Sequence, residues 1–87
     1  MKVTLKDGFE VKVNDGCLND WNFLTMLRKV DKGDYGLIVD VAEILLGGEK
    51  EVDKLADHFA VDGVTPVDAM GDALMEILTS ANELKNS

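Results

Sequence analysis

The chain has 87 residues and a formal net charge of −8 at neutral pH, from 17 acidic and nine basic side chains. This length supports one hydrophobic core, so we predict a single domain over residues 1–87. Nucleic acid and anionic membranes are excluded as expected partners of so acidic a chain, because like charges repel.

The first predicted element is a β-hairpin over residues 2–13. Apolar and polar residues alternate from residue 2 to 6 and again from 9 to 13, which is the period of strands with one buried face. Asp7 and Gly8 lie between the two runs, and an Asp-Gly pair accepts the positive φ angles of a tight type I′ turn. The pattern therefore predicts two short strands that share one apolar face.

Two helices are predicted next, over residues 20–31 and 35–46. Asn19 or Asp20 can cap the first helix, whose apolar side chains recur every three or four positions. The second segment is apolar on nearly all sides, and residues 37–41 alone would also suit a buried strand. Its length through residue 46 and the glycine pair that follows favour a helix.

Two further helices are predicted over residues 49–59 and 66–85. The first is short and amphipathic. The second begins at a clear local signal, with Thr65 as a capping hydroxyl, Pro66 at the first helical position and Asp68 in the first turn. The predicted fold class is thus α+β, an N-terminal β-hairpin followed by a small bundle of about four helices.

No cluster of residues has the composition and spacing of a catalytic, metal or phosphate site. Residues 31–36 begin like a calcium-binding loop, but Ala42 stands at the twelfth position, where a bidentate glutamate is needed. His58, beside Asp57, is expected to be solvated on a polar helix face, and Cys17 is expected to be a small buried or turn residue. We predict no catalytic residue, no metal ligand and no cofactor, and expect that the protein is not an enzyme.

The sequence also bears on location. Lys2 is followed by the alternating strand pattern in place of a secretion signal, and no apolar run reaches the roughly 18 residues that indicate a transmembrane helix. A lone cysteine cannot form a disulfide within the chain, which fits a reducing compartment. We therefore expect a cytoplasmic protein without a membrane partner.

The remaining feature is a surplus of apolar side chains for so small a domain. Most are expected to fill the core, and one face is expected to stay available for another helix or another copy of the chain, with methionine providing a surface that repacks easily. The candidate partner-binding residues are Trp21, Phe23, Leu24, Leu37, Ile38, Val41, Leu45, Met70, Leu74, Met75 and Ile77.

Three segments resemble, in order along nearly the whole chain, the short tail assembly chaperones of long-tailed phages and prophages of Gram-positive bacteria. They are residues 20–24 (DWNFL), 45–49 (LLGGE) and 63–70 (GVTPVDAM). The chain departs from that family in having Gly48 where an acidic residue is common and in a shorter linker before Gly63. It resembles the short product of the family, without the C-terminal extension of the longer, frameshifted product.

The resemblance implies a non-enzymatic chaperone in the cytoplasm of the bacterial host. Such a protein coats the long, helical tape measure protein during virion assembly until tail-tube protein subunits displace it, and self-association is expected. A different reading is a small acidic inhibitor, or decoy, that mimics nucleic acid in the basic groove of another protein; a minor enzyme or carrier is a third. Salt separates the first two, because ion pairs are screened whereas apolar contacts are not.

Overall fold

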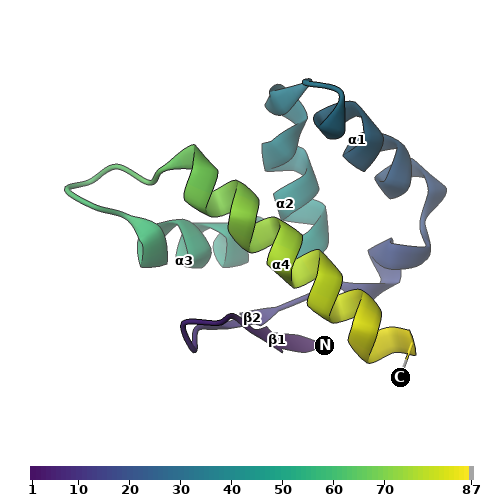
Figure 1. Cartoon of the computed structure of the whole chain (residues 1–87), viewed down its shortest axis with the longest axis horizontal. Coiled ribbons are helices and arrows are strands. Elements are labelled where there is room, and N and C mark those ends of the chain that lie inside the picture. Colours follow the sequence, from purple (N-terminus) through teal and green to yellow (C-terminus); the bar gives the residue numbers. More distant parts are fainter. Residues whose placement is uncertain (87) are drawn as a thin grey trace.

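A computed structural model describes residues 1–86, in which a hairpin of two antiparallel strands is followed by four α-helices (Figure 1). The α+β prediction is confirmed. The strands are β1 (Lys2–Thr4) and β2 (Glu10–Lys12), and the helices are α1 (Trp21–Asp31), α2 (Ile38–Leu46), α3 (Glu49–Phe59) and α4 (Val67–Asn86). Short 3₁₀ helices precede α1 and α2, namely η1 (Asp15–Asn19) and η2 (Tyr35–Leu37).

The hairpin turn differs from the expected type I′ turn. A type I′ turn needs positive φ at both central residues, whereas Gly8 has φ 95° and Asp7 is not among the described residues with positive φ. The Gly8 amide donates to the Leu5 carbonyl at 2.9 Å, and the Leu5 amide donates to the Phe9 carbonyl at 2.8 Å. Residues 5–8 therefore form a four-residue turn, and Gly8, the single residue of the loop with positive φ, directs the chain back into pairing with the first strand.

The helix boundaries follow from local chemistry. Asp20 caps α1, since its Oδ1 accepts the Asn22 amide at 2.9 Å. Segment 37–41 is not a strand, because it continues from η2 into α2. Gly47 ends α2 in the left-handed conformation with φ 80°, which lets its amide reach back to the Glu43 carbonyl.

The start of α4 is arranged differently from the expected cap. The Thr65 hydroxyl donates to the Ala56 carbonyl at 2.9 Å, so it ties the chain to α3. The Met70 amide donates to the Pro66 carbonyl at 3.2 Å, which places Pro66 just before the helix rather than at its first position. Thr65 thus serves tertiary packing in place of capping.

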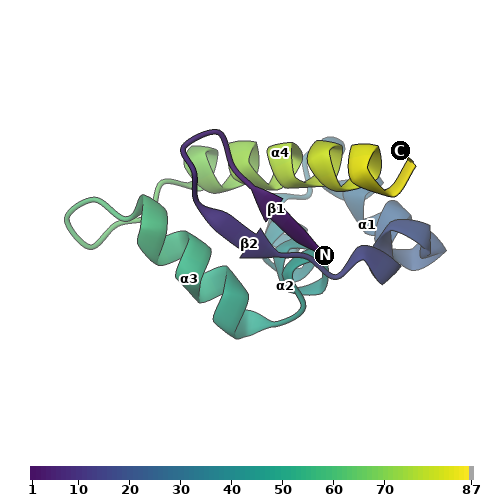
Figure 2. The same ribbon diagram turned by 90° about the horizontal axis from the view of Figure 1, so that it is seen from below.

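The hairpin and the helices enclose one apolar core. Figure 2, seen from below, shows the hairpin lying across the helices, with α4 running along the length of the molecule. The hairpin contributes its alternate residues, and each helix contributes one face. The largest fully buried side chains are Phe23, Leu45, Leu46, Leu55, Ile77 and Val3.

Polar bonds between distant residues fix the hairpin and the segment that follows it to the helices. The Lys6 amide donates to the Glu76 carboxylate of α4 at 2.7 Å, and Lys85 Nζ donates to the Asp15 carbonyl at 3.2 Å. On the other side, the Asn14 amide donates to the Leu45 carbonyl at the end of α2 at 2.7 Å. The described helices include none with the length and apolar character needed to cross a bilayer.

Candidate partner-binding groove

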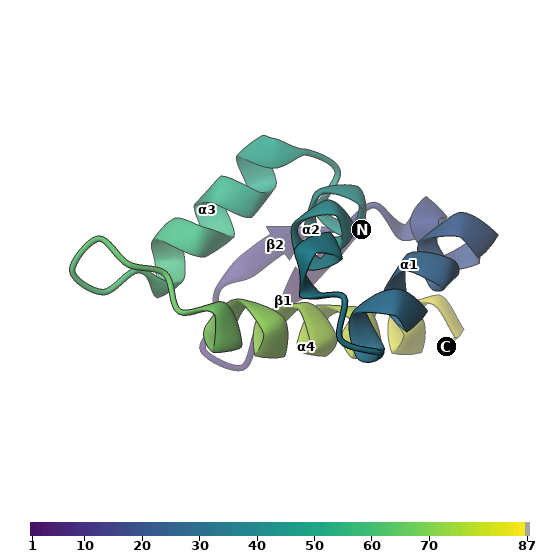
Figure 3. The ribbon, with the colours of Figure 1, turned by 90° about the horizontal axis from the view of Figure 1, so that it is seen from above.

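An open groove lies between α1, the start of α2 and the middle of α4. We call it the α1–α4 groove; its volume is about 440 Å³. The elements that form it can be followed in Figure 3, which looks onto the side of the molecule opposite the hairpin. Its lining residues are Leu27, Val30, Asp31, Tyr35, Ile38, Val41, Gly71, Asp72, Leu74, Met75, Leu78, Thr79 and Asn82.

The helical periodicity of α1 and α4 produces the groove. In α1, Phe23 turns fully into the core, whereas Leu27 and Val30 are only half-buried and line the groove. In α4, Ile77 is fully buried and Met75, two positions earlier, is 60% exposed. The groove therefore lies where the apolar faces of the two helices extend past the core.

The connection between α1 and α2 supplies an exposed aromatic ring. Tyr35 opens η2 and is 70% exposed, although it lines the groove. Ile38, the first residue of α2, also lines the groove. A tyrosine with an exposed hydroxyl and an apolar ring is a common contact residue in protein interfaces.

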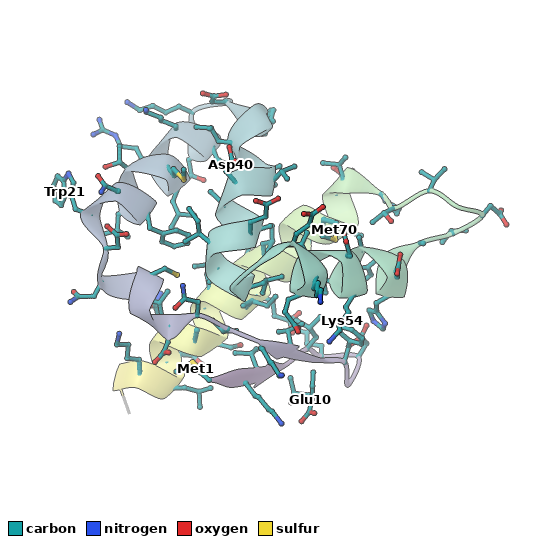
Figure 4. The ribbon with its side chains drawn as sticks, turned by 180° about the vertical axis from the view of Figure 1, so that it is seen from behind. Met1, Glu10, Trp21, Asp40, Lys54 and Met70 are labelled. Atoms are coloured by element: carbon teal, nitrogen blue, oxygen red, sulfur yellow. The ribbon has the colours of Figure 1, made fainter. Side chains whose placement is uncertain are left out.

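A second, smaller hollow lies between α2, α3 and the start of α4. Its volume is about 240 Å³ and its lining is almost wholly apolar. Met70, labelled in Figure 4, is a half-buried residue of its lining, and Val39 and Val67, also in the lining, are exposed. Ile38 and Leu74 line both this hollow and the α1–α4 groove, so the two form a continuous apolar region.

The structure separates the candidate partner-binding residues predicted from the sequence. Five are buried: Phe23, Val41, Leu45, Leu74 and Ile77. Of these, Val41 and Leu74 still line the α1–α4 groove, whereas Phe23, Leu45 and Ile77 belong to the core alone, contrary to expectation. Three are half-buried: Leu37, Ile38 and Met70. Three are exposed: Trp21, Leu24 and Met75.

The exposed candidates do not all lie together. Met75 lines the groove, whereas Trp21, 80% exposed at the start of α1, points away from the body of the molecule in Figure 4 and is not part of the lining. Leu24 lies on the same side of α1 as Leu27, one helical turn earlier. Leu27 and Tyr35 are groove residues that the sequence reasoning missed; the half-buried periodicity of α1 was the available signal for Leu27.

His58 is exposed, as expected, but its side chain also contacts the hairpin loop. Its Nε2 lies 2.6 Å from Oδ2 of Asp7 in the hairpin loop, and its ring stacks on Phe9 with a centroid separation of 4.0 Å. The hydrogen bond from His58, together with the Phe9 amide, lowers the pKa of Asp7. This pair joins the hairpin loop to α3.

Cys17 is buried, as expected for a small packed residue. Burial raises the pKa of its thiol, which disfavours the reactive thiolate. In the described part of the chain, no group of three or more His, Cys, Asp or Glu side chains is placed to hold a metal ion.

Comparisons with known proteins give no relative to set beside this geometry. No protein-family model matches the chain, and neither a curated protein nor a solved structure matches it.

Proposed function

We propose that this protein is a non-enzymatic chaperone of phage tail assembly that binds helical segments of the tape measure protein in the α1–α4 groove. The observation that carries the proposal is the groove itself, an open apolar channel walled by α1 and α4 with Tyr35 and Met75 exposed at its edges. A groove between helices is a common receptor for the apolar face of another helix.

The charge of the chain supports the same function. A net charge of −8 would keep a client coated with many copies soluble, because the coated complex repels itself. The sequence resemblance to short tail assembly chaperones supplies the client and the subunits that displace the chaperone, namely the tail-tube protein. The proposal includes contacts between neighbouring copies of the chaperone bound along the client.

The direct test is titration calorimetry with a helical fragment of a tape measure protein. Tyr35→Ser and Met75→Ser, both at exposed groove positions, should each weaken binding by roughly tenfold, because each removes apolar contact area at an interface. Trp21→Ser is the matched control for Tyr35→Ser, since it removes an exposed aromatic ring outside the groove and should leave the affinity unchanged. Loss of binding in the control alone would place the interface elsewhere.

Salt distinguishes the chaperone from the acidic decoy. Client binding through the groove should persist at about 1 M salt, where the Debye length is near 3 Å. Light scattering under the same conditions reports whether copies associate with the fragment and with one another. A protein that ignores the fragment, yet binds a basic protein only at low salt, would be a decoy, and the chaperone proposal would be wrong.

A further inference from the structure

Each helical wall of the α1–α4 groove carries a carboxylate. Asp31 is the last residue of α1, and Asp72 lies near the start of α4; both are exposed and both line the groove. The residues that line the groove include no Lys, Arg or His. The lining of the groove is therefore mostly apolar, with one negative charge on each helical wall.

Neither carboxylate is neutralised by a side chain of the same molecule. Within residues 1–86, the ion pairs involve the α3 residues Lys54 and His58 and leave Asp31 and Asp72 without a basic partner. Lys32 follows Asp31 directly in the sequence but does not line the groove. The two negative charges are thus available to an occupant of the groove.

We infer that the helix received by this groove is amphipathic, with lysine or arginine on both sides of its apolar stripe. The inference rests on the proposed function and specifies the chemistry of the client segment. Residues spaced three and four apart on the client helix would contact the apolar lining, and the residues beside them would face Asp31 and Asp72. Exposed ion pairs add little affinity, but they select the partner and fix its register.

Two synthetic peptides test this inference. Both have the same leucine stripe on an alanine-rich helix, and one carries lysine beside the stripe where the other carries glutamate. At low salt the lysine peptide should bind the full chain at least about fivefold more tightly than the glutamate peptide. The Asp31→Asn/Asp72→Asn variant should lose this preference. Asp53→Asn/Asp57→Asn, which makes the same change of charge on exposed α3 residues, should retain it.

The outcomes separate this inference from the function on which it rests. One contrary result is that both peptides bind equally, with binding weakened by Met75→Ser but not by Asp31→Asn/Asp72→Asn. That result would overturn the inferred preference for basic residues and leave the groove as the client site. A lysine preference that the α3 variant abolishes equally would show a general effect of net charge, and would also overturn it. If Met75→Ser leaves the binding of the tape measure fragment unchanged, the groove is not the client site and the proposed function itself is wrong.

Discussion

In the hairpin loop, the two carboxylate oxygens of Asp7 have different partners. Oδ1 accepts the Phe9 amide at 3.0 Å, and Oδ2 lies 2.6 Å from Nε2 of His58. Both interactions favour the charged carboxylate, the one from His58 most strongly, so the pKa of Asp7 lies below its ordinary value. A solvent-exposed side chain thereby links the loop to α3.

Asp7 should make a pH-dependent contribution to folding. A lowered pKa in the folded state stabilises the fold above the ordinary aspartate pKa of about 3.9, and this stability is lost as pH falls through the lower, folded value. We expect the difference in urea midpoint between wild type and Asp7→Asn to shrink as pH is lowered from about 5 to about 2. Asp53→Asn, which makes the same change of charge at an exposed residue of α3, is the control for a general effect of net charge. A difference independent of pH would contradict the role given to Asp7.

At the scale of elements, the junction of α3 and α4 depends on one hydroxyl. Thr65→Val should destabilise the protein by about 0.5–1.5 kcal/mol, because it leaves the Ala56 carbonyl without its donor while keeping the side-chain shape. Thr65→Ser keeps the hydroxyl and should cost less. Urea denaturation measures both. The reverse order would show that the methyl group in the neighbouring hollow matters more than the hydrogen bond.

The same junction shows which features of an element can be predicted locally. Alternation in the hairpin and the three-and-four spacing of α3 are properties of neighbouring residues, so the elements and their apolar faces followed from the sequence. The partner of the Thr65 hydroxyl is nine residues away on another helix, and no local pattern contains that information. The turn at Gly8 was misassigned for a similar reason, because its type depends on which residues pair across the strands.

At the scale of the whole molecule, helical periodicity alone does not determine which apolar residues fill the core. Ile77 and Met75 have the same apolar character and are neighbours on α4, yet Ile77 is 0% exposed and Met75 is 60% exposed. Periodicity identifies an apolar stripe, but the width of the stripe that a neighbouring helix covers depends on packing angles. An exposed apolar face could therefore be predicted from the sequence, whereas its position could not.

The difference in burial predicts very different losses of stability for substitutions at these two positions. Ile77→Ala should cost about 2–5 kcal/mol, because it leaves a cavity at a fully buried site. That cost is comparable to the total stability of about 3–5 kcal/mol expected for a domain of this size, so much of the variant should be unfolded. Met75→Ala should change stability by only about 0.5 kcal/mol, because the side chain is largely exposed. Circular dichroism during thermal unfolding compares the two, and equal losses would contradict the assignment of Ile77 to the core.

The bond between the Lys6 amide and the Glu76 carboxylate has a consequence for synthesis on the ribosome. The hairpin is translated first, but the partner of this amide emerges 70 residues later, as does Lys85, the partner of the Asp15 carbonyl. A nascent chain that ends before α4 leaves the Lys6 amide without its acceptor and leaves the apolar faces of the earlier elements uncovered where α4 packs. Native structure therefore forms late, when the last helix leaves the ribosome and closes the molecule, rather than progressively along the growing chain.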